Sequence, residues 1–200
     1  MLEVVEAVHA MYNLVRANDA YNHPTTVGEG QLPFLHYWND ISSFASPHLY
    51  LPPKAIIDAQ VQANSAQQTL PQIMSFTGAP VDNSIWKLSD GLLQTQIPMI
   101  ASATIDAMKK EATVNGAPLP FMIGEYGISY PDQVPAPEDQ AVYYSLLGAT
   151  FKALNTGNIL WDLSTGTQGG SNFSLLATDG SFLPAACVVA KNIASTPAGC

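Results

Sequence analysis

The sequence predicts an α/β fold in which parallel strands alternate with helices. Hydrophobic residues make up 47% of the 200 residues and charged residues only 12%, which indicates one domain with a sizeable core. Short apolar or β-branched runs are separated by longer segments of helical periodicity, and this alternation is typical of βαβ units and a parallel sheet. The predicted strands cover residues 25–29, 47–51, 121–124 and 158–161.

The first half of the chain contains two of these strands. Its elements are a helix, a strand, a loop with a short helix, a strand and a helix, over residues 2–18, 25–29, 31–44, 47–51 and 54–68. The first helix is amphipathic, because apolar residues recur at helical spacing. Pro24 disfavours helix just before the first strand, which ends at Glu29, and Pro52 closes the second.

The second half repeats the pattern after an irregular insertion around residues 69–98. We expect helices over 99–112, 138–154 and 185–194, with the last two strands between them. Asn115 and Gly116 suit a helix C-terminus. The run from Phe121 to Ile123 is typical of a buried parallel strand. The whole chain, residues 1–200, is interpreted as a single domain.

Charge and motifs exclude several classes of function. The formal net charge is −9 and no basic patch is present, which argues against nucleic acid and anionic membranes as partners. No apolar run reaches membrane-spanning length, and the acidic N-terminus lacks the positive region of a signal peptide. The four histidines are not at metal-binding spacing, so we expect no metal and no cofactor. Cys187, in an apolar helical run, is interpreted as a buried thiol; pairing with Cys200 is the alternative.

Glu125 is the most informative residue, because it follows a buried strand and lies between Gly124 and Gly127. A glutamate in such a place is either a structural ion pair or a catalytic group. The chain has a single arginine, Arg16, which weakens the ion-pair alternative. Tyr126 and Tyr130 are candidate residues for the rim of the same site.

Five segments, in this order, resemble one known group of enzymes. They are residues 11–24, His48-Leu49-Tyr50, residues 120–127, Ile159-Leu160-Trp161 and residues 173–185. Together they are similar to the second half of the retaining (β/α)8-barrel glycoside hydrolases, the cellulase-like superfamily. The resemblance implies a partial (half) TIM barrel made of strands five to eight, and carboxyl ends of barrel strands carry the catalytic residues.

The resemblance also implies a reaction and roles. It implies hydrolysis of O-glycosidic bonds in β-linked poly- or oligosaccharide by a retaining mechanism, with Glu125 as nucleophile. His48 and Tyr50 would face the barrel mouth, Tyr50 would hydrogen-bond the nucleophile, and Trp161 would line the sugar site. The alternatives are a packed His–Tyr pair and a plain core Trp. The superfamily is usually secreted.

One part of the family pattern is missing. The acid/base Glu of the superfamily follows an Asn, and this chain has no Asn-Glu dipeptide. Glu29 is the other Glu at a predicted strand end, so it is the candidate second carboxylate; an ordinary loop Glu is the alternative. Asp162 is a further candidate, or caps its loop. The competing hypotheses are an inactive half-barrel that binds carbohydrate or forms a homodimer through its sheet edges, and a small open α/β sheet.

Overall fold

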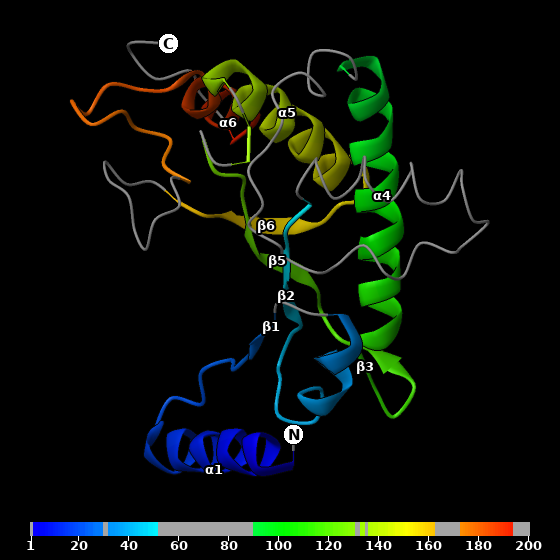
Figure 1. The fold of residues 1–200 in the computed structure, drawn as a ribbon. Coiled ribbons are helices and arrows are strands. Elements are labelled where there is room, and N and C mark those ends of the chain that lie inside the picture. Colours follow the sequence, from blue (N-terminus) through cyan, green and yellow to red (C-terminus); the bar gives the residue numbers. More distant parts are fainter. Residues whose placement is uncertain are drawn as a thin grey trace.

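The computed structural model describes residues 2–29, 32–51, 90–130, 133–134, 136–162 and 173–193. The elements in chain order are α1 (Leu2–Asn18), β1 (Gly28–Glu29), a 3-10 helix η1 (Leu32–Tyr37), β2 (Ser46–Leu49), α4 (Asp90–Glu111), β3 (Thr113–Val114), β4 (Ala117–Pro118), β5 (Met122–Tyr126), α5 (Pro137–Ala153), β6 (Gly157–Leu160) and α6 (Pro184–Ile193) (Figure 1). The predicted helix over 54–68 lies outside the described residues.

The main sheet confirms the predicted parallel α/β architecture. Its strands lie in the order β1-β2-β5-β6, and all three pairings are parallel. Consecutive strands are therefore neighbours, without the reversal of order found in doubly wound sheets. Because parallel crossovers are almost always right-handed, this order places the connecting helices on one face of the sheet.

The core lies between that face of the sheet and the helices. Leu49 of β2 and Ile123 of β5 are fully buried there, together with Ile105 and Met108 of α4 and Leu147 of α5. Figure 1 shows α4 alongside the sheet, with α5 and α6 packed together across one end of it. The helices α4 and α5 thus cover the core face of the central strands β2 and β5.

The structure corrects two predictions in the middle of the chain. Residues 90–98, expected to be irregular, belong to α4, which contains Pro98 in its interior. Proline normally ends a helical pattern, so the sequence hides this start. Asn115 and Gly116 do not simply end the helix; they form the turn of the β3–β4 hairpin, with φ of 51° and 78°. An Asn-Gly pair with two positive φ angles is the favoured two-residue hairpin turn.

The first strand is shorter than predicted, because Thr25 and Thr26 make other hydrogen bonds. The Thr25 hydroxyl donates to the carbonyl of Ile41, and the Thr26 hydroxyl donates to the carbonyl of Phe44. Only Gly28 and Glu29 pair with β2. The segment is extended and fastened to its neighbour mainly by side chains.

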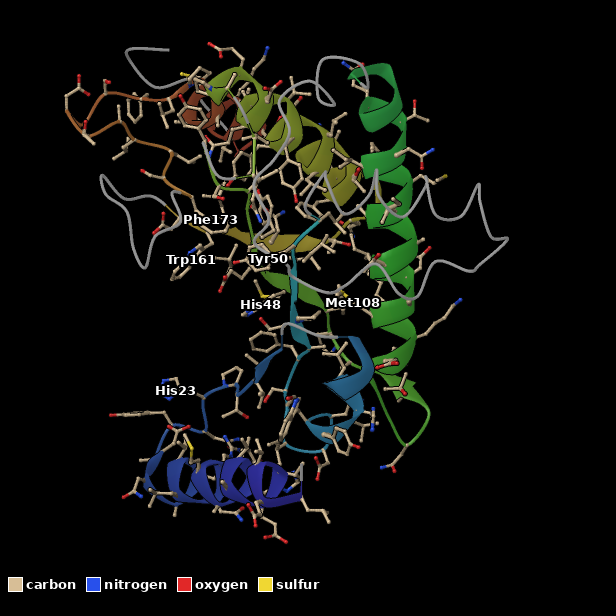
Figure 2. The ribbon with its side chains drawn as sticks, viewed as in Figure 1. His23, His48, Tyr50, Met108, Trp161 and Phe173 are labelled. Atoms are coloured by element: carbon tan, nitrogen blue, oxygen red, sulfur yellow. The ribbon has the colours of Figure 1, made fainter. Side chains whose placement is uncertain are left out.

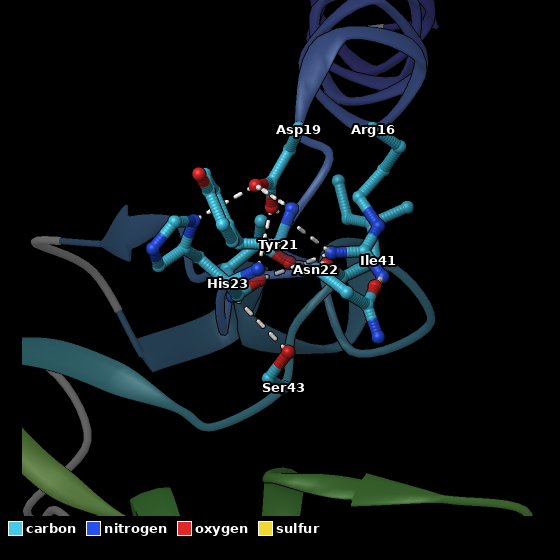
Figure 3. A network of polar contacts seen from close by, with 8 residues as sticks. Arg16, Asp19, Tyr21, Asn22, His23, Ile41 and Ser43 are labelled. Atoms are coloured by element: carbon cyan, nitrogen blue, oxygen red, sulfur yellow. Dashed lines mark hydrogen bonds and ion pairs between the residues drawn. The ribbon is translucent and has the colours of Figure 1, made fainter.

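The turn after α1 is held by a polar network around Asp19 (Figure 3). The carboxylate accepts hydrogen bonds from the backbone N–H groups of Tyr21 and His23, and it contacts His23 Nδ1 at 2.8 Å. Arg16 donates to the carbonyl of His23 at 3.0 Å. These hydrogen bonds lower the pKa of the Asp19 carboxyl group, and the bond to the His23 side chain has the largest effect.

The predicted amphipathic helix α1 is present, but its apolar face is only partly covered. None of its residues is buried, and Leu2, Met11 and Leu14 are exposed. Figure 1 shows α1 lying apart from α4 and α5. No helix within the described ranges is long and apolar enough to cross a membrane.

Cys187 corrects a further prediction. It is disulfide-bonded and is not a free thiol. The other cysteine of the sequence, Cys200, lies outside the described residues.

Candidate functional site

A β-bulge in β5 directs Glu125. From the Ala45–Phe121 pair to the His48–Glu125 pair, β2 advances three residues and β5 advances four. The register with β6 shows the same extra residue, because Ile123 pairs with Asn158 and Tyr126 with Leu160. The pairing with β2 thus places one additional residue in β5 between Phe121 and Glu125, and the pairing with β6 places it between Ile123 and Tyr126. Such a bulge re-aims the side chains that follow it.

The consequence is that Glu125 leaves the core face. In a regular strand Glu125 would lie on the same face as the fully buried Ile123, two residues earlier. The extra residue instead places Tyr126 on the core face. Tyr126 is buried and is in register with the buried Leu49. Glu125 lies on the opposite face with a side chain that is 23% exposed.

His48 of β2 is the partner of Glu125. The two residues are in register on neighbouring strands, and His48 Nδ1 lies 3.7 Å from Glu125 Oε2. The His48 side chain is 28% exposed, so the pair is half-buried and accessible from solvent. His48 can hold a carboxylate by charge when the imidazole is protonated. Glycine at position 28 of β1 leaves room for this ring, since a Cβ there would lie 3.0 Å from His48 Nε2.

Aromatic rings line the site beyond this pair. The rings of His48 and Tyr50 are 6.5 Å apart, and those of Tyr50 and Phe173 are 5.8 Å apart, both edge to face. Figure 2 shows Trp161 and Phe173 near one another, and a Cβ at position 127 would meet both the Trp161 backbone and the Phe173 ring. Trp161 follows β6 directly and is 42% exposed, so an indole face is available for stacking. The peptide bond between Trp161 and Asp162 is cis.

Close backbone approach joins the ends of β5 and β6. The backbone N–H of Trp161 donates to the carbonyl of Tyr126 at 2.9 Å. Gly127 has no room for a side chain, because a Cβ there would lie 2.9 Å from Phe173 Cδ1 and 3.3 Å from the Tyr144 hydroxyl. The glycine after Glu125 therefore lets the Trp161 and Phe173 segments approach the carboxylate strand.

Three buried tyrosines lie behind the site. Burial raises the pKa of Tyr126 to about 12 and raises the pKa of Tyr143 and Tyr144 further. Their hydroxyls therefore keep their protons at neutral pH. Tyr126, expected on the rim, is a core residue instead, because the bulge turns it inward.

The other two predicted carboxylates are Glu29 and Asp162. The backbone of Glu29 is in register with Pro47, directly after the Gly28–Ser46 pair; the Glu29 side chain is not described. Asp162 is half-buried beside Trp161, and its charge contributes to the raised pKa of Tyr144. In the described part of the chain, no group of three or more His, Cys, Asp or Glu residues is arranged to hold a metal ion.

Sequence reasoning missed Phe173 and Tyr144 as parts of this site. In the sequence, Phe173 is only the first residue of the segment 173–185, and Tyr144 lies in a predicted helix without a site motif. The available signal was weak: Gln140 and Tyr144 are polar groups one turn apart on the buried side of α5.

The comparisons with known proteins bear on the fold. No family model matches the sequence, and no curated protein sequence matches it significantly. Among solved structures, the chain is similar to an endo-laminarinase from Formosa Hel1_33_131, with a TM-score of 0.56 and 13% sequence identity. The match covers 90% of this chain and 50% of that chain, so this chain spans about half the length of that protein. At this identity the likeness shows a shared fold.

Proposed function

We propose that this chain is a glycoside hydrolase-type protein and forms the C-terminal half of a TIM-like barrel. It would act on O-glycosidic bonds of β-linked poly- or oligosaccharide by a retaining mechanism. The consecutive parallel strand order supports the barrel half, because a barrel is wound without reversal. The similarity to half of an endo-laminarinase supports the same class of substrate.

The observation that carries the proposal is the position of Glu125. It is the carboxylate that a bulge turns away from the core, at the carboxyl end of a parallel strand, beside His48. In this proposal Glu125 attacks the anomeric carbon, His48 holds the carboxylate, Tyr50 orients it, and Trp161 supports a sugar ring by stacking. Each role uses a group on the same side of the sheet.

Retention requires a second carboxyl group about 5–5.5 Å from the nucleophile. We assign Glu29 as the candidate within this chain, with the alternative that the other half of the barrel supplies it. The second group would protonate the leaving oxygen and then activate water. Catalysis by the isolated chain therefore requires a second carboxyl group from the chain itself, in addition to Glu125.

The test is release of reducing ends from aryl β-glycosides and from laminarin, followed by NMR of the first product anomer. We expect wild-type turnover with retained configuration and a loss of at least a thousandfold in Glu125→Gln. Glu138→Gln, an exposed glutamate in the first turn of α5, is the matched control and should keep wild-type rates. Equal rates for wild type and Glu125→Gln would remove this mechanism. No release by the wild type would remove catalysis by this chain alone.

A second candidate function is an inactive half-barrel that binds carbohydrate or self-associates through its sheet edges. The exposure of β6 favours it: Ile159 is 53% exposed, although parallel strands are usually buried on both faces. Light scattering after size exclusion should then give a dimer, which Ile159→Lys converts to a monomer. A compact wild-type monomer would contradict edge pairing.

A further inference from the structure

Two polar side chains of α5 face the sheet side of the helix. Gln140 and Tyr144 are one helical turn apart, and they are 0% and 1% exposed. Residues four apart lie on the same face of a helix. Both side chains end on backbone groups of the segments that follow β5 and β6 rather than on their own helix.

Ile128, three residues after Glu125, is held from both sides of its backbone. Its N–H donates to the Tyr144 hydroxyl at 3.4 Å, and its carbonyl accepts from Gln140 Nε2 at 3.0 Å. Both polar groups of this residue are therefore fastened to α5. The segment directly after the proposed nucleophile cannot shift without breaking them.

The same two side chains reach the segments after β6. The Tyr144 hydroxyl donates to the carbonyl of Trp161 at 3.3 Å, and Gln140 Nε2 donates to the carbonyl of Ser174 at 3.5 Å. Trp161 and Ser174 carry or adjoin the aromatic rings of the site. Since both partners of Gln140 are carbonyls, its amide nitrogen is the atom that must face them.

These bonds lie in a dry environment. Buried backbone groups that lose a partner cannot turn to water, so each bond is costly to remove. Burial also raises the pKa of Tyr144, so its hydroxyl keeps the proton that it donates to Trp161. Gly127 permits the close approach, because any side chain there would meet the Tyr144 hydroxyl and Phe173.

We propose that Gln140 and Tyr144 are positioning residues, a clamp on α5 that fixes the Trp161 and Ser174 segments against the end of the Glu125 strand. The catalytic consequence of the clamp rests on the proposed function. In that function, the clamp aligns the sugar-stacking surface with the nucleophile. Whether the clamp holds the Trp161 and Ser174 segments in place can be tested without a substrate.

The first measurement is native-state amide hydrogen exchange in Tyr144→Phe, which removes the hydroxyl and keeps the ring. We expect the Ile128 amide to exchange at least tenfold faster than in wild type, after the change in global unfolding is subtracted. Thr150→Val is the matched control, because the buried Thr150 hydroxyl donates to the carbonyl of Leu146 within α5 itself. Its Ile128 amide should stay within twofold of wild type. Unchanged Ile128 exchange in Tyr144→Phe would overturn the clamp.

Gln140→Met serves where Tyr144→Phe fails to fold. It removes both donors of Gln140, and we expect at least tenfold faster exchange of the amides at 175 and 176, which follow Ser174. Wild-type exchange at both positions would overturn the clamp.

The second measurement separates the clamp from the proposed function. On an aryl β-glycoside, Tyr144→Phe should lower kcat at least fivefold at equal folded fraction, while Thr150→Val should not. Faster exchange with unchanged kcat would overturn the positioning role. A wild type without turnover would refute the proposed function, and the exchange experiment would still decide the clamp.

Discussion

Replacing Gly124 by alanine is the sharpest test of the bulge that directs Glu125. A Cβ at position 124 would lie 2.7 Å from the carbonyl oxygen of Ser46 and would also meet the Ser46 side chain. Rotation of the serine hydroxyl relieves only the second contact. The contact with the backbone remains, so β5 and β2 must separate or the alanine cannot be accommodated.

The size of the effect follows from the geometry. Ordinary contact begins at 3.4 Å, so the strands must separate by about 0.7 Å beside the bulge. A shift of that size takes neighbouring N–H···O bonds beyond good hydrogen-bond distance, and each buried bond contributes about 1 kcal/mol. With roughly two bonds affected, we expect a loss of about 2 kcal/mol in the free energy of unfolding, within the range for overpacking.

Urea unfolding followed by circular dichroism measures this loss. Gly157→Ala on the neighbouring strand β6 is the control, because a Cβ there would meet Met122 Cβ at an ordinary 3.4 Å. We expect it to stay within about 0.5 kcal/mol of wild type. If Gly124→Ala is as stable as Gly157→Ala, with the same slope in urea, then β2 and β5 are not in the close contact described and the account of Glu125 fails.

Three further predictions concern titration and packing. The folded-state pKa of Tyr126, about 12, exceeds its ordinary value of 10.0, so its stabilisation is full below pH 10 and is lost as pH rises to 12. Because folded Tyr126 keeps its proton to a higher pH than unfolded Tyr126, urea midpoints should fall less between pH 8 and pH 11 in Tyr126→Phe than in wild type. Asp19 has a lowered pKa, so its stabilisation is present above pH 3.8 and is lost below it; the drop in Tm between pH 6 and pH 3 should be smaller in Asp19→Asn. Lys109 donates to Leu154 and Thr156 and lies over the Phe121 ring, so Lys109→Met should cost about 1–2 kcal/mol in urea unfolding, whereas the exposed Lys110→Met should be near neutral.

The alternation of strands and helices could be predicted because it depends on local patterns. The helix over 2–18, the buried run before Glu125 and the helix after Pro137 each bury or segregate apolar residues at a regular period. The start of α4 could not be predicted, because Pro98 lies inside a helix whose stability comes from packing rather than from propensity. Likewise, Asn115-Gly116 suits a helix end and a hairpin turn equally, and only the pairing of the flanking residues decides between them.

The candidate site was predictable in part for a related reason. The i,i+2 spacing of His48 and Tyr50 places both on one face in any regular strand, and their rings do lie together. The contact of His48 with Glu125 depends on a register between strands that are far apart in the sequence. The clamp residues depend on which side of α5 faces the sheet, which is set by tertiary packing.

For Glu125, the side-chain direction expected from regular strand alternation differs from the direction in the folded structure. Strict alternation would bury the carboxylate beside Ile123, at the high cost of desolvating a charge. The extra residue in β5 exchanges Glu125 with Tyr126, so the charge reaches solvent and the aromatic ring fills the core. Glycine at position 124 is the feature of the sequence that permits this, since a larger residue would collide with Ser46. A strand built only for packing would need neither the bulge nor the glycine. Because the pairings with β2 and with β6 both contain the extra residue, the aim of the carboxylate is set within the described sheet. Glu125 is therefore turned away from the core by the pairings of these strands alone.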